Sequence, residues 1–192
     1  MAKCIAQRQK PDFTAVVRQK LEPLQHPTKA MRYGLRNEET ARMAYVAYQQ
    51  EQHPGLKCSP VGFVIDPAHP WLGASPDSIV NDTTALHPTG LLEIKCPFVQ
   101  HISLDEYITS KSSCLSSTKQ LKRSHQYYFQ IQVAMLVCNK QWCDLCVWAP
   151  NFLVIERIMR DEDLLARIMP KLEKFYFSNL LPALAAECQQ II

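Results

Sequence analysis

Short runs of strand-forming residues, separated by turn-rich segments, predict a β-sheet in the middle of the chain. Val, Ile and Leu gather in stretches of five to seven residues, and Asp, Pro, Gly and Asn fill the intervals. Two further stretches of this kind follow a polar segment and a helical one. The predicted strands cover residues 61–65, 74–80, 91–95, 142–149 and 154–160.

Helical spacing of apolar residues is found before the first strands. A short helix is expected over 13–21, and a longer one from about Asn37 to Gln52. Asn37 is the predicted N-cap of the longer helix, with Glu38 and Glu39 at the positive end of its dipole. Its core-facing side chains are expected to be Met43, Val46 and Ala47.

Two more helices are predicted in the second half of the chain. One runs from about 124 to 138, with Tyr128, Ile131 and Met135 along one stripe. The other is amphipathic and begins at 161–163. Pro170 is expected to kink this last helix and to leave two shorter ones.

The order helix, three strands, helix, two strands, helix predicts a mixed α/β fold with a central sheet flanked by helices. The 192 residues are expected to form a single domain, because no repeat or long linker divides them. Residues 100–123 are polar and contain the run Ser-Ser-Cys-Leu-Ser-Ser, which predicts a mobile loop.

Charge says little about partners. The net charge of +3 is too small to indicate nucleic acid, and any basic footprint would have to be local, at Lys119, Lys122, Arg123 and His125. The first ten residues lack the apolar segment of a secretory signal, and no apolar run approaches the roughly 18 residues that span a bilayer. We expect a soluble protein without membrane contact. The nucleus or cytoplasm fits best, and a mitochondrial location is left open.

Eight cysteines raise the alternatives of a metal site or free thiols. Cys143 and Cys146 form one C-x-x-C, and Cys138 lies nearby. On a strand, positions three apart point to opposite faces, so buried free thiols in a reducing compartment are preferred. A structural domain held by zinc through these three cysteines is the alternative.

The residues with the clearest chemistry are Asp77, Glu93 and Lys95. Glu93 and Lys95 alternate with Leu92 and Ile94 on one strand, so the carboxylate and the ammonium share a face. If the strand bearing Asp77 pairs beside it, a second carboxylate joins them. An E-x-K pair on a strand is also common on solvated faces, where it has no catalytic meaning.

Two carboxylates held together repel each other, and a divalent cation with oxygen ligands relieves that repulsion. Such an ion activates water and stabilises the charge that develops on a phosphodiester. A neighbouring lysine can orient or deprotonate the attacking water, or neutralise negative charge. The combination indicates phosphodiester hydrolysis with Mg²⁺, or with Mn²⁺ in its place.

Four segments resemble the PD-(D/E)xK nuclease superfamily and, within it, the YqaJ viral recombinase or lambda-type exonuclease family. The resemblance covers about residues 31–160. It implies the restriction-endonuclease-like core and a 5′-to-3′ exonuclease acting on double-stranded DNA in recombination or repair. The segments are Tyr33-Gly-Leu-Arg-Asn-Glu38-Glu-Thr-Ala41, Gly73-Ala-Ser-Pro-Asp77, Leu92-Glu-Ile-Lys-Cys-Pro-Phe98 and Tyr127-Tyr-Phe-Gln130-Ile-Gln132.

The resemblance also implies roles. Asp77, Glu93 and the carbonyl of Ile94 would bind the metal, with Glu38 reaching it directly or through water. Lys95 would be the catalytic lysine, and Gln130 would hold the water or the scissile phosphate. Gln132, about 200° away on the helix, would make a polar contact elsewhere.

Contacts to DNA are expected from residues around this centre. Ser75 would bind a phosphate or cap its turn, and His125 would bind a phosphate or begin the helix. Tyr127 lies one helical turn before Gln130 on the same face. The expected nucleic-acid-binding residues are Ser75, Lys122, Arg123, His125 and Tyr127.

Two departures from the family pattern leave a second function open. The N-terminal segment that helps to bind a DNA end is not recognised, which suggests a truncated N-terminal part, and Gln100 and His101 stand where the family can place an arginine. The alternative is therefore a nucleic-acid-binding protein that keeps the nuclease fold without turnover. A homo-oligomer and a single-strand annealing or recombination partner are further expectations.

Overall fold

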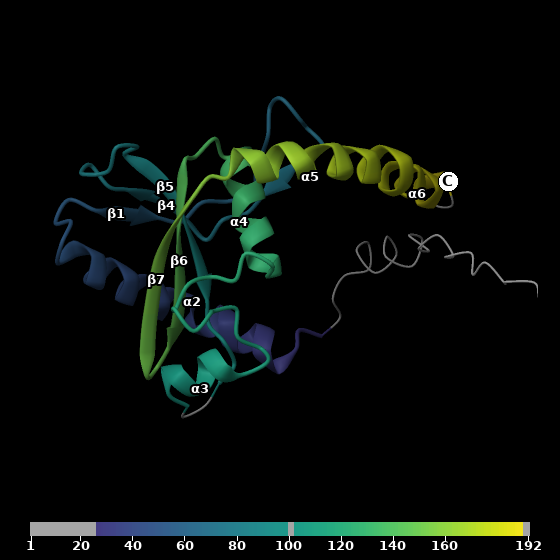
Figure 1. Cartoon of the computed structure of the whole chain (residues 1–192). Helices are drawn as coiled ribbons and strands as arrows, with labels where there is room; N and C mark the ends of the chain where they lie inside the picture. Colours follow the sequence, from purple (N-terminus) through teal and green to yellow (C-terminus); the bar gives the residue numbers. More distant parts are fainter. Residues whose placement is uncertain (1–25, 100–101, 190–192) are drawn as a thin grey trace, which may run out of the picture. The chain divides into compact units, whose positions relative to one another are not determined.

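Five strands form the main sheet of this computed structural model, in the spatial order β1-β4-β5-β6-β7 (Figure 1). Strands β5 and β6 are parallel, and the other neighbouring pairs of this sheet are antiparallel. The chain passes from β5 to β6 through two helices, because parallel strands need a long crossover. The predicted mixed α/β fold is thereby confirmed. The strands are β1 (Lys57–Ser59), β4 (Ser78–Asn81), β5 (Thr89–Lys95), β6 (Trp142–Ala149) and β7 (Phe152–Met159).

The structure describes residues 26–99 and 102–189. It divides into two compact units. One is Pro27–Leu165, and the other contains residues 166–189. The first unit holds both sheets and every residue of the predicted site, while the helix predicted at 13–21 lies outside the described residues. Within the described ranges, no helix has the length and apolar character needed to cross a lipid bilayer.

Helix α2 (Lys29–Gln50) begins eight residues earlier than predicted. Its N-cap is Thr28, whose hydroxyl accepts a hydrogen bond from the Met31 N–H at 3.2 Å. Asn37 is therefore not a cap: its side-chain amide donates to the Tyr33 carbonyl at 2.8 Å within the helix. Glu38 consequently lies near the middle of α2, away from the positive end of the dipole.

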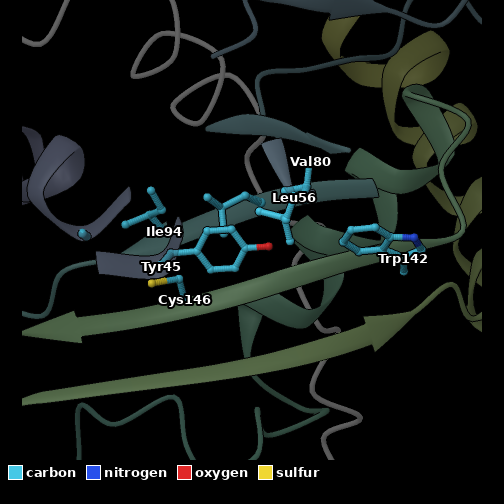
Figure 2. Close-up of a cluster of buried hydrophobic side chains, with 8 residues drawn as sticks. Tyr45, Leu56, Val80, Ile94, Trp142 and Cys146 are labelled. Atoms are coloured by element: carbon cyan, nitrogen blue, oxygen red, sulfur yellow. The ribbon is translucent and has the colours of Figure 1, made fainter. Parts of the chain in front are cut away.

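The buried face of α2 also differs from the prediction. Ala41 and Tyr45 are buried, whereas Met43 and Ala47 are exposed and Val46 only borders the core. Tyr45 determines which face of α2 is buried, because its hydroxyl can reach a buried hydrogen-bond acceptor. Figure 2 shows the resulting cluster, in which these side chains pack with others from the sheet. The other members are Leu56, Val80, Leu92, Ile94, Trp142 and Cys146.

The strand predicted over 74–80 is interrupted. Gly73–Ala74 forms β3 and pairs with β2 (Val64–Ile65) in a separate two-stranded sheet, and the main sheet resumes only at Ser78. Pro76 cannot donate a ladder hydrogen bond, so the chain changes sheet at Ser75-Pro76-Asp77. β2 is shorter than the predicted strand over 61–65, and β1 was not predicted.

Part of the polar stretch 100–123 is ordered structure, contrary to the predicted mobile loop. Helix α3 (Leu104–Thr109) begins with a capping box in which Ser103 and Glu106 bond to each other's backbone. Further on, Leu115 and Leu121 form an isolated β-bridge, and both side chains are buried. The S-x-x-E spacing of Ser103 and Glu106 is a recognisable helix-start signal. The buried side chains of Leu115 and Leu121 hold the later part of this stretch in place.

The later elements follow the sequence prediction closely. Helix α4 (Gln126–Val137) buries Tyr128, Ile131 and Met135, as expected, and β6 has the predicted bounds. At the C-terminal end, α5 (Glu162–Phe175) continues through Pro170. The interruption expected at the proline is found later, at a π-helical turn η1 (Tyr176–Leu180), before α6 (Leu181–Gln189).

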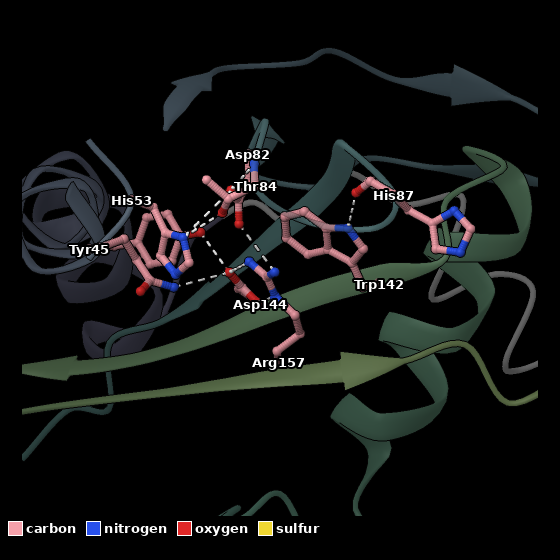
Figure 3. Close-up of polar contacts among 9 residues, drawn as sticks. Tyr45, His53, Asp82, Thr84, His87, Trp142, Asp144 and Arg157 are labelled. Atoms are coloured by element: carbon pink, nitrogen blue, oxygen red, sulfur yellow. Dashed lines mark hydrogen bonds and ion pairs between the residues drawn. The ribbon is translucent and has the colours of Figure 1, made fainter. Parts of the chain in front are cut away.

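A buried polar network lies on the face of β6 that α2 covers (Figure 3). Asp144 is fully buried and accepts hydrogen bonds from the Tyr45 hydroxyl at 2.7 Å and from Arg157 Nε at 2.8 Å. Arg157 also pairs with Asp82 at 3.3 Å, and its guanidinium lies 3.7 Å from the ring centroid of Trp142. Both carboxylates are thus paired, as burial of charge requires.

Candidate active site

The two predicted carboxylates lie side by side at one end of the sheet. β4 pairs with β5 with Ser78 opposite Leu92, which places Asp77 beside Glu93. Asp77 Oδ2 accepts the backbone N–H of Ile94 at 2.5 Å. The second carboxylate therefore lies directly before the strand that pairs with the E-x-K strand, and it joins Glu93 as expected.

Glu93 is the centre of the hydrogen bonding. Its side chain projects from a strand whose other face, with Leu92 and Ile94, is packed in the core, and it is only 3% exposed. Lys95 Nζ donates to Glu93 Oε1 at 2.5 Å, and Gln130 Nε2 donates to the same oxygen at 2.6 Å. The E-x-K pair is therefore a buried one and not the solvated pair of the alternative interpretation.

Burial controls the electrostatics of this group. It raises the pKa of both Asp77 and Glu93, although Lys95 opposes the rise in each. Burial acts to lower the pKa of Lys95, but the carboxylates of Glu93 and Asp77 outweigh it and the net shift is upward. The negative charge of Asp77 also contributes to the raised pKa of Glu93.

The donor set suits a hard divalent cation. Within the described ranges, no three His, Cys, Asp or Glu side chains gather as a metal cage. Two neighbouring carboxylates remain, and Mg²⁺ is commonly held by one or two carboxylates while it keeps several waters. The two carboxylates present therefore fit Mg²⁺ as ligands.

Glu38 is linked to the Asp77–Glu93 pair through other side chains. Its carboxylate forms an ion pair with Arg42 at 2.8 Å, and Arg42 Nε donates to the Ser78 hydroxyl at 2.9 Å. Ser78 follows Asp77 directly, so Glu38 is linked to the site through two side chains. Arg42 and Ser78 were not recognised from the sequence, although the i,i+4 spacing of Glu38 and Arg42 is a readable signal. Glu39, exposed, also pairs with Arg42.

Side chains of helix α4 contact the Glu93–Lys95 pair. Gln130 points to Glu93, and Tyr127, one turn earlier, places its ring centroid 4.5 Å from Lys95 Nζ. Gln132 points the other way: it is buried, donates to the Met159 carbonyl at 3.0 Å and accepts the Asp161 N–H at 2.7 Å. The predicted separation of the two glutamines is confirmed.

The other residues expected to contact DNA differ in their exposure and in the bonds that they make. His125 is the N-cap of α4, so the helix-start role is the one observed. Lys122 Nζ donates to the Ser113 carbonyl at 2.8 Å, whereas the Arg123 side chain is 80% exposed and lies 3.7 Å from Asp161. Ser75 is exposed and was expected to bind a phosphate or cap its turn.

Each member of the Glu93–Lys95 pair borders a cleft. The first, about 320 Å³, has Glu93 and Gln130 in its wall together with Ser75 and Phe129. The second, about 580 Å³, is lined by Lys95 and by aromatic side chains that include Tyr127. Glu93 thus borders the first cleft and Lys95 the second. Cys96 also lines the second cleft, and burial raises the pKa of its thiol to about 11.

A family model described as YqaJ-like viral recombinase domain matches residues 5–141, well over half of the chain. The chain belongs to this family. The match begins before residue 31, where the sequence resemblance was recognised, and ends before β6. Comparison with curated proteins gave no match.

Solved structures show the same fold as this YqaJ-family chain. An alkaline exonuclease from Laribacter hongkongensis superposes with a TM-score of 0.67 at 26% identity, covering 100% of this chain and 90% of the exonuclease. A structure of LHK-Exo in complex with dAMP gives a TM-score of 0.66 at 26% identity, covering 94% and 85%. The predicted PD-(D/E)xK-like core is confirmed by these neighbours.

Proposed function

We propose that this YqaJ-family chain is a Mg²⁺-dependent deoxyribonuclease that degrades double-stranded DNA from the 5′ end, in recombination or repair. The observation that carries the proposal is the meeting of Asp77, Glu93 and Lys95 at one end of the sheet, with Gln130 bonded to Glu93. Structural neighbours that are alkaline exonucleases support the same reaction class.

Asp77, Glu93 and the Ile94 carbonyl would hold the metal, with Glu38 behind them through Arg42 and Ser78. A bound Mg²⁺ would neutralise charge on the scissile phosphate and lower the pKa of a coordinated water. Mn²⁺ has similar ligand preferences and would substitute for it.

The chain's own side chains orient the reaction. Lys95 orients the attacking water or neutralises negative charge on the phosphate, because its raised pKa keeps the ammonium protonated, and its bond to Glu93 fixes where it can act. Gln130 donates to the same Glu93 oxygen as Lys95 and helps to hold the carboxylate in one orientation. Ser75 borders the cleft that holds Glu93, where a hydroxyl can donate to a phosphate of the substrate. Arg123, being largely exposed, is the cation of the 122–125 segment best placed for the DNA backbone.

The deciding experiment is cleavage of end-labelled linear duplex DNA with Mg²⁺, with Mn²⁺ and with EDTA. Lys95→Ala is expected to lower the rate by roughly 10²- to 10⁴-fold, with the circular dichroism spectrum unchanged. The matched control is Lys57→Ala, since Lys57 is exposed on β1. The position of the released label gives the polarity.

Two outcomes would contradict the proposal. Substantial cleavage by Lys95→Ala would remove Lys95 from the reaction. DNA binding without cleavage by the folded wild type, on linear, nicked and single-stranded substrates, would favour the nucleic-acid-binding protein without turnover.

A further inference from the structure

The ammonium of Lys95 is held on two sides. On one side it donates to Glu93 Oε1 at 2.5 Å, and on the other it lies 4.5 Å from the ring centroid of Tyr127. The Lys95 side chain is only 20% exposed. Its position is therefore fixed by a carboxylate and an aromatic face, and little by solvent.

A lysine needs such support because its stem has four rotatable bonds and its head is a compact point charge. The bond to Glu93 alone leaves the ammonium free to swing about one oxygen atom. An aromatic ring attracts a cation through its negative face, and the attraction grows when water is excluded. The Tyr127 ring supplies this second restraint from a different element, α4.

Tyr127 is itself restrained by His125. The imidazole Nδ1 accepts the backbone N–H of Tyr127 at 3.2 Å, which makes His125 the N-cap of α4. The ring centroids of His125 and Tyr127 are 4.5 Å apart, and the angle between the ring planes is 62°. His125 therefore fixes both the backbone and the ring of Tyr127.

The support and the target belong to one connected group. Gln130, one turn after Tyr127, donates to the same Glu93 oxygen that receives Lys95. The first turns of α4 thus contact both members of the Glu93–Lys95 pair, the carboxylate through Gln130 and the ammonium through Tyr127.

We infer that Tyr127 is a positioning residue for the Lys95 ammonium, and that His125 positions Tyr127. In this role neither side chain needs to bind DNA, which differs from the role expected from the sequence. The kinetic consequence rests on the proposed nuclease function, but the positioning of Lys95 is a property of the folded chain and can be measured without turnover.

The first test measures the reactivity of Lys95 by reductive methylation and mass spectrometry of the intact chain. Tyr127→Leu is expected to raise the methylation rate of Lys95 by roughly 2- to 30-fold, the range of a cation–π contact. Tyr127→Phe keeps the ring and should give a much smaller rise. Lys57 in the same samples is the internal reference and should not change. Equal Lys95 rates in wild type and Tyr127→Leu would overturn the inference.

The second test separates positioning from DNA contact. Tyr127→Leu is expected to lower kcat with little change in KM, and Tyr127→Phe to recover most of the loss. Tyr48→Leu, at an exposed tyrosine of α2, is the matched control and should behave as wild type. His125→Asn keeps an N-cap but loses the ring contact, so an intermediate kcat is expected.

Binding of DNA by the Lys95→Ala chain completes the test. In that background there is no ammonium to position, so adding Tyr127→Leu should leave the Kd for duplex DNA unchanged. A clear further loss of affinity would show that Tyr127 contacts DNA and would overturn the inference. If the wild type does not cleave DNA, the proposed function fails, and the methylation result alone decides whether Tyr127 positions Lys95.

Discussion

Gln130 and Gln132 show how two residues of the same type, two positions apart, acquire different tasks. Gln130 is exposed apart from its bond to Glu93, whereas Gln132 is fully buried and satisfies one carbonyl and one N–H of the chain around Met159 and Asp161. A helix separates these positions by about 200°. Gln130 should therefore contribute mainly to the cleavage rate, and Gln132 mainly to the stability of the fold.

Gln130→Ala is expected to lower the cleavage rate by roughly 10- to 100-fold, because it removes a hydrogen bond to a proposed metal ligand. Its free energy of unfolding should change by less than about 0.5 kcal/mol. Gln132→Ala is the matched control. It leaves buried groups unsatisfied and should cost about 1–3 kcal/mol of stability. Urea unfolding and DNA cleavage on the same preparations measure both, and equal rate losses would contradict the assignment.

Asp77→Asn is expected to weaken metal binding, because it removes one of the two neighbouring carboxylates and leaves an amide that binds a hard cation less well. Isothermal titration with Mn²⁺ measures the affinity without any need for turnover. Asp66→Asn is the control, since Asp66 also lies in a turn but bonds to His69 and Ala68. If Asp77→Asn and the wild type have the same affinity, Asp77 is not a ligand.

At the scale of elements, strand β5 decides where the site lies. Its residues from Gly90 to Ile94 are buried, and its neighbours are β4 on one side and β6 on the other. Gly90 lies against the indole of Trp142, and a Cβ built there would lie 2.2 Å from the ring. The start of β5 therefore packs on Trp142 only because residue 90 has no side chain.

Gly90→Ala is expected to destabilise the fold by about 1–3 kcal/mol, because the Trp142 ring would have to move within a packed core. The free energy of unfolding in urea measures the loss. Gly34→Ala on α2 is the control: a Cβ there has no atom within 4 Å, and the substitution should stabilise the helix by roughly 0.5–1 kcal/mol. A neutral Gly90→Ala would show that the indole relaxes freely.

At the scale of the molecule, the Asp82–Arg157–Asp144 network joins elements that are distant in sequence. Asp82 follows β4, Asp144 lies on β6 and Arg157 on β7, and Tyr45 reaches them from α2 (Figure 3). Asp82 is only 1% exposed. Burial acts to raise its pKa, but hydrogen bonds from Thr84 and Arg157 and the nearby His53 outweigh burial, and the net pKa is lowered.

Asp82→Asn should therefore lower stability by about 1–3 kcal/mol at neutral pH, and the loss should shrink in acid. A carboxyl whose native pKa is depressed stabilises the fold above its unfolded pKa, near pH 3.9, and loses that contribution as the pH falls through the native value. Urea unfolding from about pH 7 to pH 3 measures the difference. Asp105→Asn, at an exposed position of α3, is the control. A loss that stays constant down to pH 3 would contradict the assignment.

Much of the fold could be predicted because it depends on local pattern. The bounds of β6 and the buried stripe of α4 follow from residue spacing alone, and so does the opposition of Gln130 and Gln132. The face shared by Glu93 and Lys95 follows from the two-residue period of a strand. The short segments around Asp77, Glu93 and Gln130 were sufficient to recognise the family, and the family match and the structural neighbours confirm it.

Only the tertiary structure decided contacts that depend on partners far along the chain. Tyr45 faces the core because Asp144, 99 residues away, accepts its hydroxyl, and no spacing rule within α2 contains that information. Glu38 was expected to reach the metal directly or through water, and the structure links it through Arg42 to Ser78, which follows Asp77. Tyr127 lies on Lys95 because β5 and α4 meet in space. Sequence periodicity fixes which side chains share a face of a helix or strand, whereas the packing of separate elements decides which face is buried and what it contacts.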